Sequence, residues 1–129
     1  MTINELVKAS HNNAVAKGFY GDDGKADRNF GECIALMHSE LSEALEAHRN
    51  GRDCQVDPCY YSDPEAWPDK ELWKLNFLKD IKDTTADELA DTMIRIADTA
   101  GFLGINLEEH IKAKMAYNAT REKLHGKKY

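Results

Sequence analysis

The sequence predicts an all-α protein, an antiparallel bundle of four main helices with an irregular insertion between the second and third. Apolar residues recur with the period of an amphipathic helix, and no segment shows the period of two that is typical of a half-buried strand. All three prolines, Pro58, Pro64 and Pro68, lie in one short stretch, so proline interrupts no helix outside it. The length suits a single domain, residues 1–129, with residues 51–83 as the insertion.

Capping residues and a glycine delimit the first two helices. The first is expected at about 3–17, because Thr2 and Glu5 fit a capping box in which each side chain accepts a hydrogen bond from a backbone N–H group. The second is expected at about 32–50 and ends at Gly51, since glycine commonly marks a helix end. A polar loop separates these two helices.

The second half of the chain holds the other helices. Within the insertion, one short helix is expected near residues 71–78. The third main helix is expected at about 86–102, where apolar residues recur at helical spacing. The fourth begins after Asn106, which forms an N-cap pattern with Glu109, and is expected to run to about residue 124. A short antiparallel bundle is the simplest arrangement of these helices.

Composition and charge exclude several classes of protein. The net charge of −6 argues against nucleic-acid binding, and no apolar run is long enough to span a membrane. The first residues lack the pattern of a signal peptide, so we expect a cytoplasmic protein with reduced cysteines. Six basic residues, Lys127 and Lys128 among them, and one acid give the segment from Lys112 to Tyr129 a charge of +5 and leave −11 elsewhere. Such a segment suits phosphate binding or a solvated tail.

Two pairs of acids stand one helical turn apart on the second and third helices. Glu40 and Glu43 belong to HSELSEALEAHR, and Glu88 and Asp91 belong to DELADTMIRIAD. On a helical wheel each pair lies at the margin of an apolar stripe that we expect to be buried. The two stripes consist of Ile34, Met37, Leu41, Ala44, Leu45 and His48, and of Leu89, Met93, Ile96, Ala100 and Leu103. Glu46 lies three residues after Glu43, the same spacing as in the two acid pairs. On the helical wheel, however, it points well away from the apolar stripe.

Carboxylates in this pattern suit a divalent cation. Mg²⁺ prefers oxygen ligands at about 2.0–2.1 Å in octahedral geometry, and side chains at i and i+3 lie close enough to share an ion. Two pairs on packed helices would form a four-carboxylate cup whose mutual repulsion the ion removes. Two other interpretations stay open. Glu88 caps its helix in a box with Thr85, and Glu40 and Glu43 are ordinary surface charges.

The acids and their surroundings resemble the all-α nucleoside triphosphate pyrophosphohydrolases of the MazG type, a superfamily that includes the dimeric dUTP and dCTP pyrophosphatases. The family motif, E-x-x-E followed by E-x-x-D, is similar to Glu40-Leu-Ser-Glu43 and Glu88-Leu-Ala-Asp91. The run KMAYNATREKLHGKKY is similar to the end of small MazG-like proteins, many of them encoded by phages. The resemblance covers the second, third and fourth helices. The insertion makes the separation between the two motifs longer than in compact members.

The resemblance implies Mg²⁺-dependent hydrolysis of a (d)NTP between its α- and β-phosphates, which yields the (d)NMP and pyrophosphate. It implies that Glu40, Glu43, Glu88 and Asp91 hold the Mg²⁺, for which Mn²⁺ can substitute. Glu43 would orient the attacking water, with Glu40 as the second catalytic carboxylate. The resemblance also implies a homodimer or homotetramer, and a phage-type protein that acts in the host cytoplasm.

The last predicted helix carries a second polar face. Lys114, Asn118 and Arg121 recur at i, i+4 and i+7, with Tyr117 beside them. A lysine, an amide and an arginine in a row suit phosphate oxygens, which arginine can bind in a bidentate way. The resemblance implies that this set contacts the substrate phosphates. An ordinary solvated helix face is the alternative.

The aromatic residues and cysteines allow other interpretations. Tyr117, Trp67 and Trp73 would stack on a nucleobase, or the two tryptophans would pack the insertion onto the bundle or a partner subunit. The spacing of Cys54 and Cys59 is too loose to predict a zinc site. The rival functional class is a non-catalytic helical module that binds a protein partner or a nucleotide. Binding of a divalent ion separates the two classes.

Overall fold

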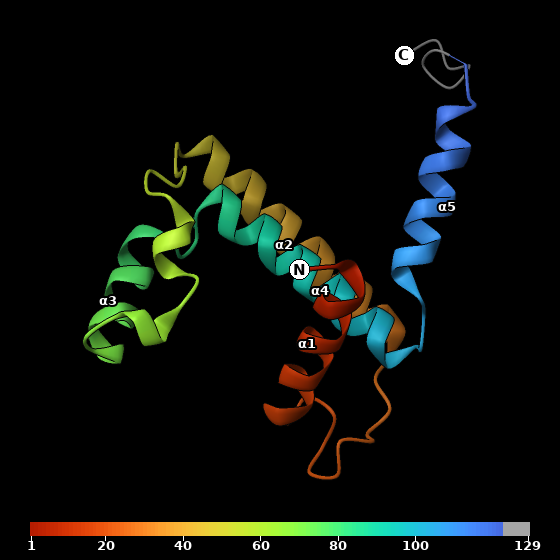
Figure 1. Cartoon of the computed structure of the whole chain (residues 1–129), viewed down its shortest axis with the longest axis horizontal. Coiled ribbons are helices and arrows are strands. Elements are labelled where there is room, and N and C mark those ends of the chain that lie inside the picture. The colour runs from red at the N-terminus through yellow and green to blue at the C-terminus, as the bar shows by residue number, and fades with distance from the viewer. Residues whose placement is uncertain (123–129) are drawn as a thin grey trace. The chain divides into compact units, whose positions relative to one another are not determined.

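The computed structural model describes residues 1–122 and consists of helices joined by turns and loops, with no strand in this part of the chain (Figure 1). The all-α prediction is therefore confirmed. None of the described helices is both long and apolar enough to cross a membrane. In chain order the elements are α1 (Ile3–Ala16), α2 (Phe30–Arg49), the 3-10 turns η1 (Pro58–Tyr61) and η2 (Pro64–Ala66), α3 (Lys70–Asp80), α4 (Thr85–Phe102) and α5 (Leu107–Ala119).

The starts of α1 and α2 follow from local capping chemistry. In the predicted capping box, Glu5 N donates to Thr2 Oγ1 at 3.1 Å and Thr2 N donates to a Glu5 carboxylate oxygen at 2.7 Å. α2 begins at Phe30, two residues earlier than expected, because the Asn29 side chain accepts a hydrogen bond from Glu32 N at 3.2 Å. Each of these bonds satisfies a backbone donor that the helix itself leaves unpaired.

α2 ends in a Schellman motif. Gly51 has a φ of 65°, and the N–H groups of Gly51 and Arg52 donate to the carbonyls of His48 and Ala47 at 3.1 and 2.9 Å. A residue with a side chain is strained in this left-handed conformation, so glycine ends the helix as predicted. The same two hydrogen bonds fix the backbone of Arg52 directly after the helix.

The cap of α4 differs from the prediction. Thr84 Oγ1 accepts a hydrogen bond from Asp87 N at 3.3 Å, and the Asp87 carboxylate accepts one from Asp83 N at 3.0 Å. The helix is therefore capped one residue earlier than a box of Thr85 and Glu88 would require. The interpretation of Glu88 as a capping residue is wrong, and its carboxyl group is available for other contacts.

α5 begins as predicted but is shorter. Asn106 Oδ1 accepts a hydrogen bond from Glu109 N at 3.3 Å, which confirms the N-cap. The helix ends at Ala119 rather than near residue 124, and Thr120 Oγ1 donates to the carbonyl of Tyr117 at 2.7 Å. The Tyr117 carbonyl also accepts a hydrogen bond from Thr120 N at 3.0 Å, so both bonds of this threonine close the last turn of the helix.

The chain forms two compact units. The central unit, Arg28–Arg95, holds α2, the insertion with α3, and the first part of α4. The terminal unit joins Met1–Asp27 to the segment from Ile96 onward and holds α1, the end of α4, and α5. All four predicted carboxylates lie in the central unit, whereas the predicted phosphate-binding face of α5 lies in the terminal unit.

The terminal unit is built around a buried polar network. Tyr20 is 1% exposed, and its hydroxyl donates to Asp98 Oδ1 at 2.8 Å. His11 Nδ1 lies 3.0 Å from the same oxygen. A Cβ at Gly101 would lie 2.7 Å from the Cβ of His11, so α1 and α4 approach this closely only because residue 101 has no side chain.

In the central unit, α2 and the first part of α4 run side by side in opposite directions (Figure 1). The buried positions of α2 are Cys33, Glu40, Ala44 and Ala47. Three of these four side chains are small, and small side chains at a helix contact allow the two axes to approach closely. Glu40 therefore lies on the buried stripe itself rather than at its margin.

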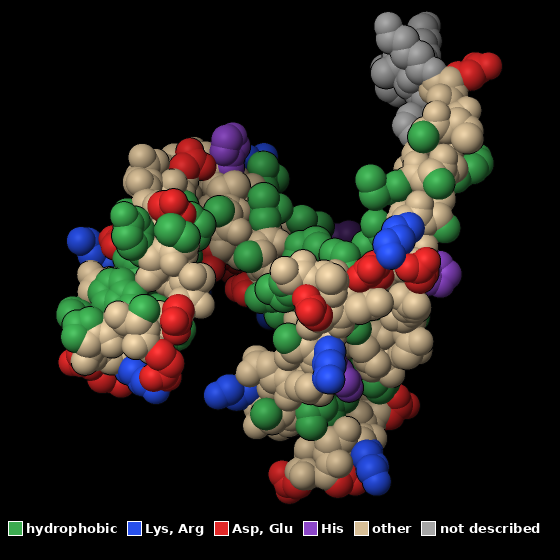
Figure 2. All heavy atoms as spheres, in the orientation of Figure 1, with side chains coloured by type: hydrophobic (Ala, Val, Ile, Leu, Met, Phe, Trp, Pro, Cys, Tyr) green, Lys and Arg blue, Asp and Glu red, His purple; other side chains and the backbone are tan. Residues whose placement is uncertain are grey.

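The predicted apolar stripes are mostly open to solvent in the single chain. Leu41 and Leu45 on α2 are 45% and 49% exposed, and Leu89 and Met93 on α4 are also exposed. Figure 2 shows hydrophobic side chains at the molecular surface among the polar ones. Two further stripe positions, His48 and Leu103, are exposed as well. In the single chain, the buried stripe positions are Ala44 on α2 and Ala100 on α4, so the prediction that both stripes are buried holds only in part.

The insertion carries its own aromatic cluster. Tyr61 stacks on Trp67 and meets Phe77 edge-on, while Phe77 stacks on Trp73, with ring centroids 5.6, 5.9 and 5.5 Å apart. Both indole N–H groups donate to backbone carbonyls, those of Tyr60 and Tyr61. All of these contacts lie within the insertion, so packing of the tryptophans onto the bundle or a partner subunit stays a prediction. A base contact by either of them stays a prediction.

Candidate metal centre

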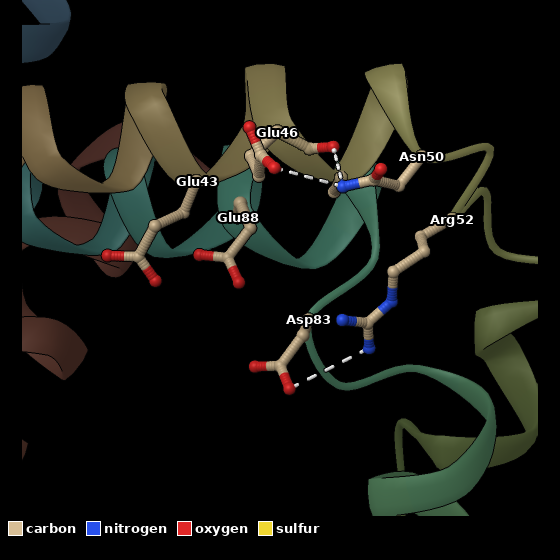
Figure 3. A pocket seen from close by; sticks show the side chains of 7 residues that line it. Glu43, Glu46, Asn50, Arg52, Asp83 and Glu88 are labelled. Carbon is tan, nitrogen blue, oxygen red and sulfur yellow. Dashed lines mark hydrogen bonds and ion pairs between the residues drawn. The ribbon is translucent and has the colours of Figure 1, made fainter.

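Three of the four predicted carboxylates converge between α2 and α4. One oxygen each of Glu40, Glu43 and Glu88 lies within 4.8 Å of the other two. Glu40 and Glu43 lie one turn apart on α2, and Glu88 meets them from the first turn of α4. Figure 3 shows the carboxylates of Glu43 and Glu88 next to each other. We call these three residues the carboxylate cluster.

Arg95 holds Glu40 in position. Arg95 Nε donates to Glu40 Oε1 at 2.6 Å, and Glu40 is buried. A buried carboxylate without such a partner would carry a large desolvation cost. Arg95 was not predicted, although it lies seven residues after Glu88 and hence on the same face of α4. That spacing is the sequence signal that identifies it.

Glu88 and Glu43 lie in contrasting environments. Glu88 is 3% exposed, and burial raises its pKa to about 7, with a hydrogen bond to Glu40 and the charge of Glu43 acting in the same direction. Glu43 is exposed, and its Oε1 accepts a hydrogen bond from Ser39 Oγ at 3.0 Å. The cluster therefore combines a buried carboxyl group that titrates near neutral pH with one that solvent and ligands reach.

A second group of acids shares Glu88. Oxygens of Asp83, Asp87 and Glu88 also lie within 4.8 Å of one another. Asp83 precedes α4 with a φ of 58°. Its carboxylate is bonded to Lys82 and lies 3.8 Å from Arg52, and the Lys82 contact lowers the pKa of Asp83. The protein's own cations thus balance much of the charge of this second group.

Asp91, the fourth predicted ligand, belongs to neither group. It is half-buried, and burial raises its pKa, followed by the charges of Asp87 and Glu40. Its carboxyl group lies in the same acidic environment but does not converge on the cluster. A role for Asp91 as a metal ligand therefore stays a prediction.

A cavity of about 210 Å³ adjoins the cluster (Figure 3). Its lining includes Glu43, Glu88 and Arg52. Glu46 lines it too, and its carboxylate accepts a hydrogen bond from Asn50 Nδ2 at 3.1 Å. Glu46 belongs to neither group of converging acids, although the cavity extends along α2 as far as its side chain.

On α5, two of the predicted phosphate-binding residues, Lys114 and Arg121, lie close to the ring of Tyr117. Lys114 Nζ and the Arg121 guanidinium carbon lie 5.0 and 5.8 Å from the centre of the Tyr117 ring. Asn118 Oδ1 is buried and has no hydrogen-bond partner within the described part of the chain. Contact between this face and substrate phosphates stays a prediction. The expected contribution of residues 127–128 lies outside the described residues.

No protein-family model, no curated protein and no solved structure matches this chain. A function is therefore argued from the chemistry of the carboxylate cluster and the cavity. The three converging ligand atoms are all carboxylate oxygens. Hard oxygen donors suit Mg²⁺ or Mn²⁺ better than metals that prefer sulfur or imidazole ligands.

Proposed function

We propose that this protein is a Mg²⁺-dependent hydrolase that cleaves a (d)NTP between its α- and β-phosphates and releases pyrophosphate. The observation that carries the proposal is the convergence of Glu40, Glu43 and Glu88 within 4.8 Å beside a cavity. Carboxylates this close repel one another unless a cation joins them, and burial with this repulsion raises the pKa of Glu88 to about 7. The resemblance of both acid pairs to the MazG-type motif supports the same reaction.

The residues fit a small divalent cation. Two ligand oxygens on opposite sides of an octahedral Mg²⁺ ion are about 4.2 Å apart. The three cluster oxygens, all within 4.8 Å of one another, therefore reach one ion through small side-chain movements. Glu40, held by Arg95, and the buried Glu88 form the fixed part of this set. Asp91 is the fourth ligand that the motif implies.

A divalent cation in this cluster would polarise the phosphoryl group and offset the charge of the leaving pyrophosphate. Glu43 is the residue best placed to orient the attacking water, because it is exposed, lines the cavity and is held by Ser39. Glu40 lacks that access and instead fixes the position of the ion through its bond to Arg95. The two catalytic carboxylates thus have different roles.

The remaining parts of the proposal concern α5 and the oligomer. Lys114, Asn118 and Arg121 would bind substrate phosphates and Tyr117 the base, which their shared face on α5 supports. The antiparallel four-helix bundle would be completed in a homodimer or homotetramer. The exposed apolar face that includes Leu41 is a surface that another copy would cover. We further propose that the enzyme acts in the cytoplasm.

A nucleotide panel tests the proposed reaction. Incubation with NTPs and dNTPs plus Mg²⁺ should release pyrophosphate from at least one nucleotide, and Glu43→Gln should lower that rate by about 100-fold or more. Glu71→Gln, on the exposed surface of α3, is the matched control and should keep the wild-type rate. Absence of pyrophosphate with every nucleotide, or an undiminished rate for Glu43→Gln, would contradict the proposal.

Calorimetric titration with Mn²⁺ separates this enzyme from a non-catalytic helical module. The enzyme should bind the ion, and Glu88→Gln should weaken binding strongly because it removes a buried ligand. A module that binds a partner or a nucleotide without hydrolysing it has no need of an ion at the cluster. If the protein is such a module, titration with Mn²⁺ should give no heat of binding for the wild type or for Glu88→Gln.

A further inference from the structure

Arg52 reaches the cavity from the residue that directly follows the end of α2. Both of its backbone groups are fixed. Arg52 N donates to the carbonyl of Ala47 at 2.9 Å, and its carbonyl accepts from Thr85 N at 3.0 Å. These bonds tie Arg52 to the last turn of α2 and the first residue of α4, the two helices that carry the carboxylate cluster. The arginine backbone therefore keeps its place relative to the cluster.

The guanidinium group of Arg52 has donor capacity to spare. Among the described residues its ion pair is with Asp83, at 3.8 Å, which is too long for a hydrogen bond. Asp83 is also bonded to Lys82, so it does not depend on Arg52 for charge balance. About half of the Arg52 side chain is exposed. A planar group with five N–H donors thus lines the cavity and is held by a single weak partner (Figure 3).

The other charged residues that line the cavity are four acids, Glu43, Glu46, Asp83 and Glu88. Glu88 lines the same cavity, is almost fully buried, and has as its hydrogen-bonding neighbour another carboxyl group, that of Glu40. A ligand must therefore be cationic where it meets Glu88 and Glu43 and anionic where it meets Arg52. A divalent cation with bound phosphate oxygens meets both requirements. A cavity of about 210 Å³ is small for a whole nucleotide but suits phosphate groups.

We propose that Arg52 binds phosphate oxygens of the metal-bound substrate, in particular those of the pyrophosphate that leaves. This inference rests on the proposed function and adds a phosphate-binding residue within the central unit, independent of α5. Arginine suits the role because its fork can bind two phosphate oxygens at once. When the ligand enters, Arg52 leaves Asp83, whose charge Lys82 continues to balance.

Binding of magnesium pyrophosphate, compared among arginine variants, tests the inference. Arg52→Ala should bind Mn²⁺ alone as the wild type does but bind magnesium pyrophosphate about 10- to 100-fold more weakly. Arg52→Lys should recover part of that loss, because lysine keeps the charge but not the bidentate geometry. Arg49→Ala, an exposed arginine in the last turn of α2 outside the cavity lining, is the matched control and should bind like the wild type.

Asp83→Asn provides a second test that does not remove the arginine. It releases Arg52 from its present partner, so affinity for magnesium pyrophosphate should stay the same or increase. A loss as large as that of Arg52→Ala, with Mn²⁺ binding unchanged, would show that the ion pair only supports the structure and would overturn the inference. An unchanged affinity in Arg52→Ala would overturn it too.

The controls also distinguish this inference from the proposed function. A wild-type protein that binds no Mn²⁺ refutes both. A wild-type protein that binds Mn²⁺ and magnesium pyrophosphate, together with an Arg52→Ala variant of equal affinity, refutes the role of Arg52 and leaves the metal centre intact.

Discussion

Replacement of Glu88 by glutamine is expected to stabilise the metal-free protein at pH 8 and to weaken its response to Mg²⁺. Burial raises the pKa of Glu88 from 4.5 to about 7, so the folded protein holds this proton more tightly than the unfolded chain does. The stability contributed by the protonated carboxyl group is fully present below about pH 4.5. It is lost as the pH rises through about 7, where the folded protein must carry the charge.

The size of the effect follows from the pKa change. A rise from 4.5 to about 7 corresponds to at most about 3 kcal/mol. Water in the adjoining cavity screens the charge, so we expect about 1–2 kcal/mol at pH 8. Glutamine has the shape of glutamate, stays neutral, and can donate a hydrogen bond to Glu40. The free energy of unfolding of Glu88→Gln should therefore exceed that of the wild type by about 1–2 kcal/mol at pH 8. At pH 5 the two free energies should agree within about 0.5 kcal/mol.

Urea denaturation followed by circular dichroism, in EDTA at both pH values, measures these differences. Excess Mg²⁺ at pH 8 should then stabilise the wild type much more than Glu88→Gln, because the variant has lost a buried ligand and binds the ion far more weakly. Glu71→Gln should follow the wild type throughout. The reasoning is refuted if Glu88→Gln is the less stable protein at pH 8 in EDTA, or if Mg²⁺ raises both midpoints equally.

Three further variants probe the packing that supports the site. Tyr20→Phe removes the hydroxyl that donates to the buried Asp98 and should cost about 1–3 kcal/mol in urea denaturation; an unchanged midpoint would show that this bond contributes nothing. Arg95→Met leaves the buried Glu40 without its cation, so we expect a loss of about 2–3 kcal/mol and weaker Mn²⁺ binding by calorimetry. Gly101→Ala places a Cβ 2.7 Å from a side-chain atom of α1 and should cost about 1–3 kcal/mol; wild-type stability would mean that the helices separate freely.

The helix boundaries could be predicted because capping is a local property. The box of Thr2 and Glu5, the N-cap at Asn106 and the stop at Gly51 each involve residues a few positions apart. Errors arose where two neighbouring residues offered the same chemistry. Thr84 rather than Thr85 caps α4, and no propensity distinguishes two adjacent threonines.

The buried face of α2 could not be predicted from periodicity. The pattern identified Leu41 and Leu45 as an apolar face, but periodicity does not say whether the partner of that face is in the same chain. Of that predicted stripe the single chain buries Ala44, and it also buries Ala47 and the charged Glu40, which the stripe did not include. A glutamate is compatible with that position only because of Arg95, a partner 55 residues away in the sequence.

Three of the four predicted acids converge, whereas Asp91 does not join them. Spacing alone did not predict this convergence; the prediction came from the matching positions of the two acid pairs on two amphipathic helices and from the resemblance to the MazG-type motif. Arg52 was not predicted, because the insertion was treated as irregular from its first residue. The glycine before it carried the relevant signal, since a Schellman motif fixes the backbone of the residue that follows the glycine.

The small side chains on the buried stripe of α2 have a consequence for the evolution and engineering of the site. Cys33, Ala44 and Ala47 are small and buried on α2, and small side chains at a helix contact let two helices approach closely. The proposed ion requires such an approach, because its carboxylates come from both helices. A larger residue at Ala44 would widen the gap without altering any charged group. In the proposed metal centre, affinity and the choice between the smaller Mg²⁺ and a larger cation would thus be tuned from positions that carry no ligand atom.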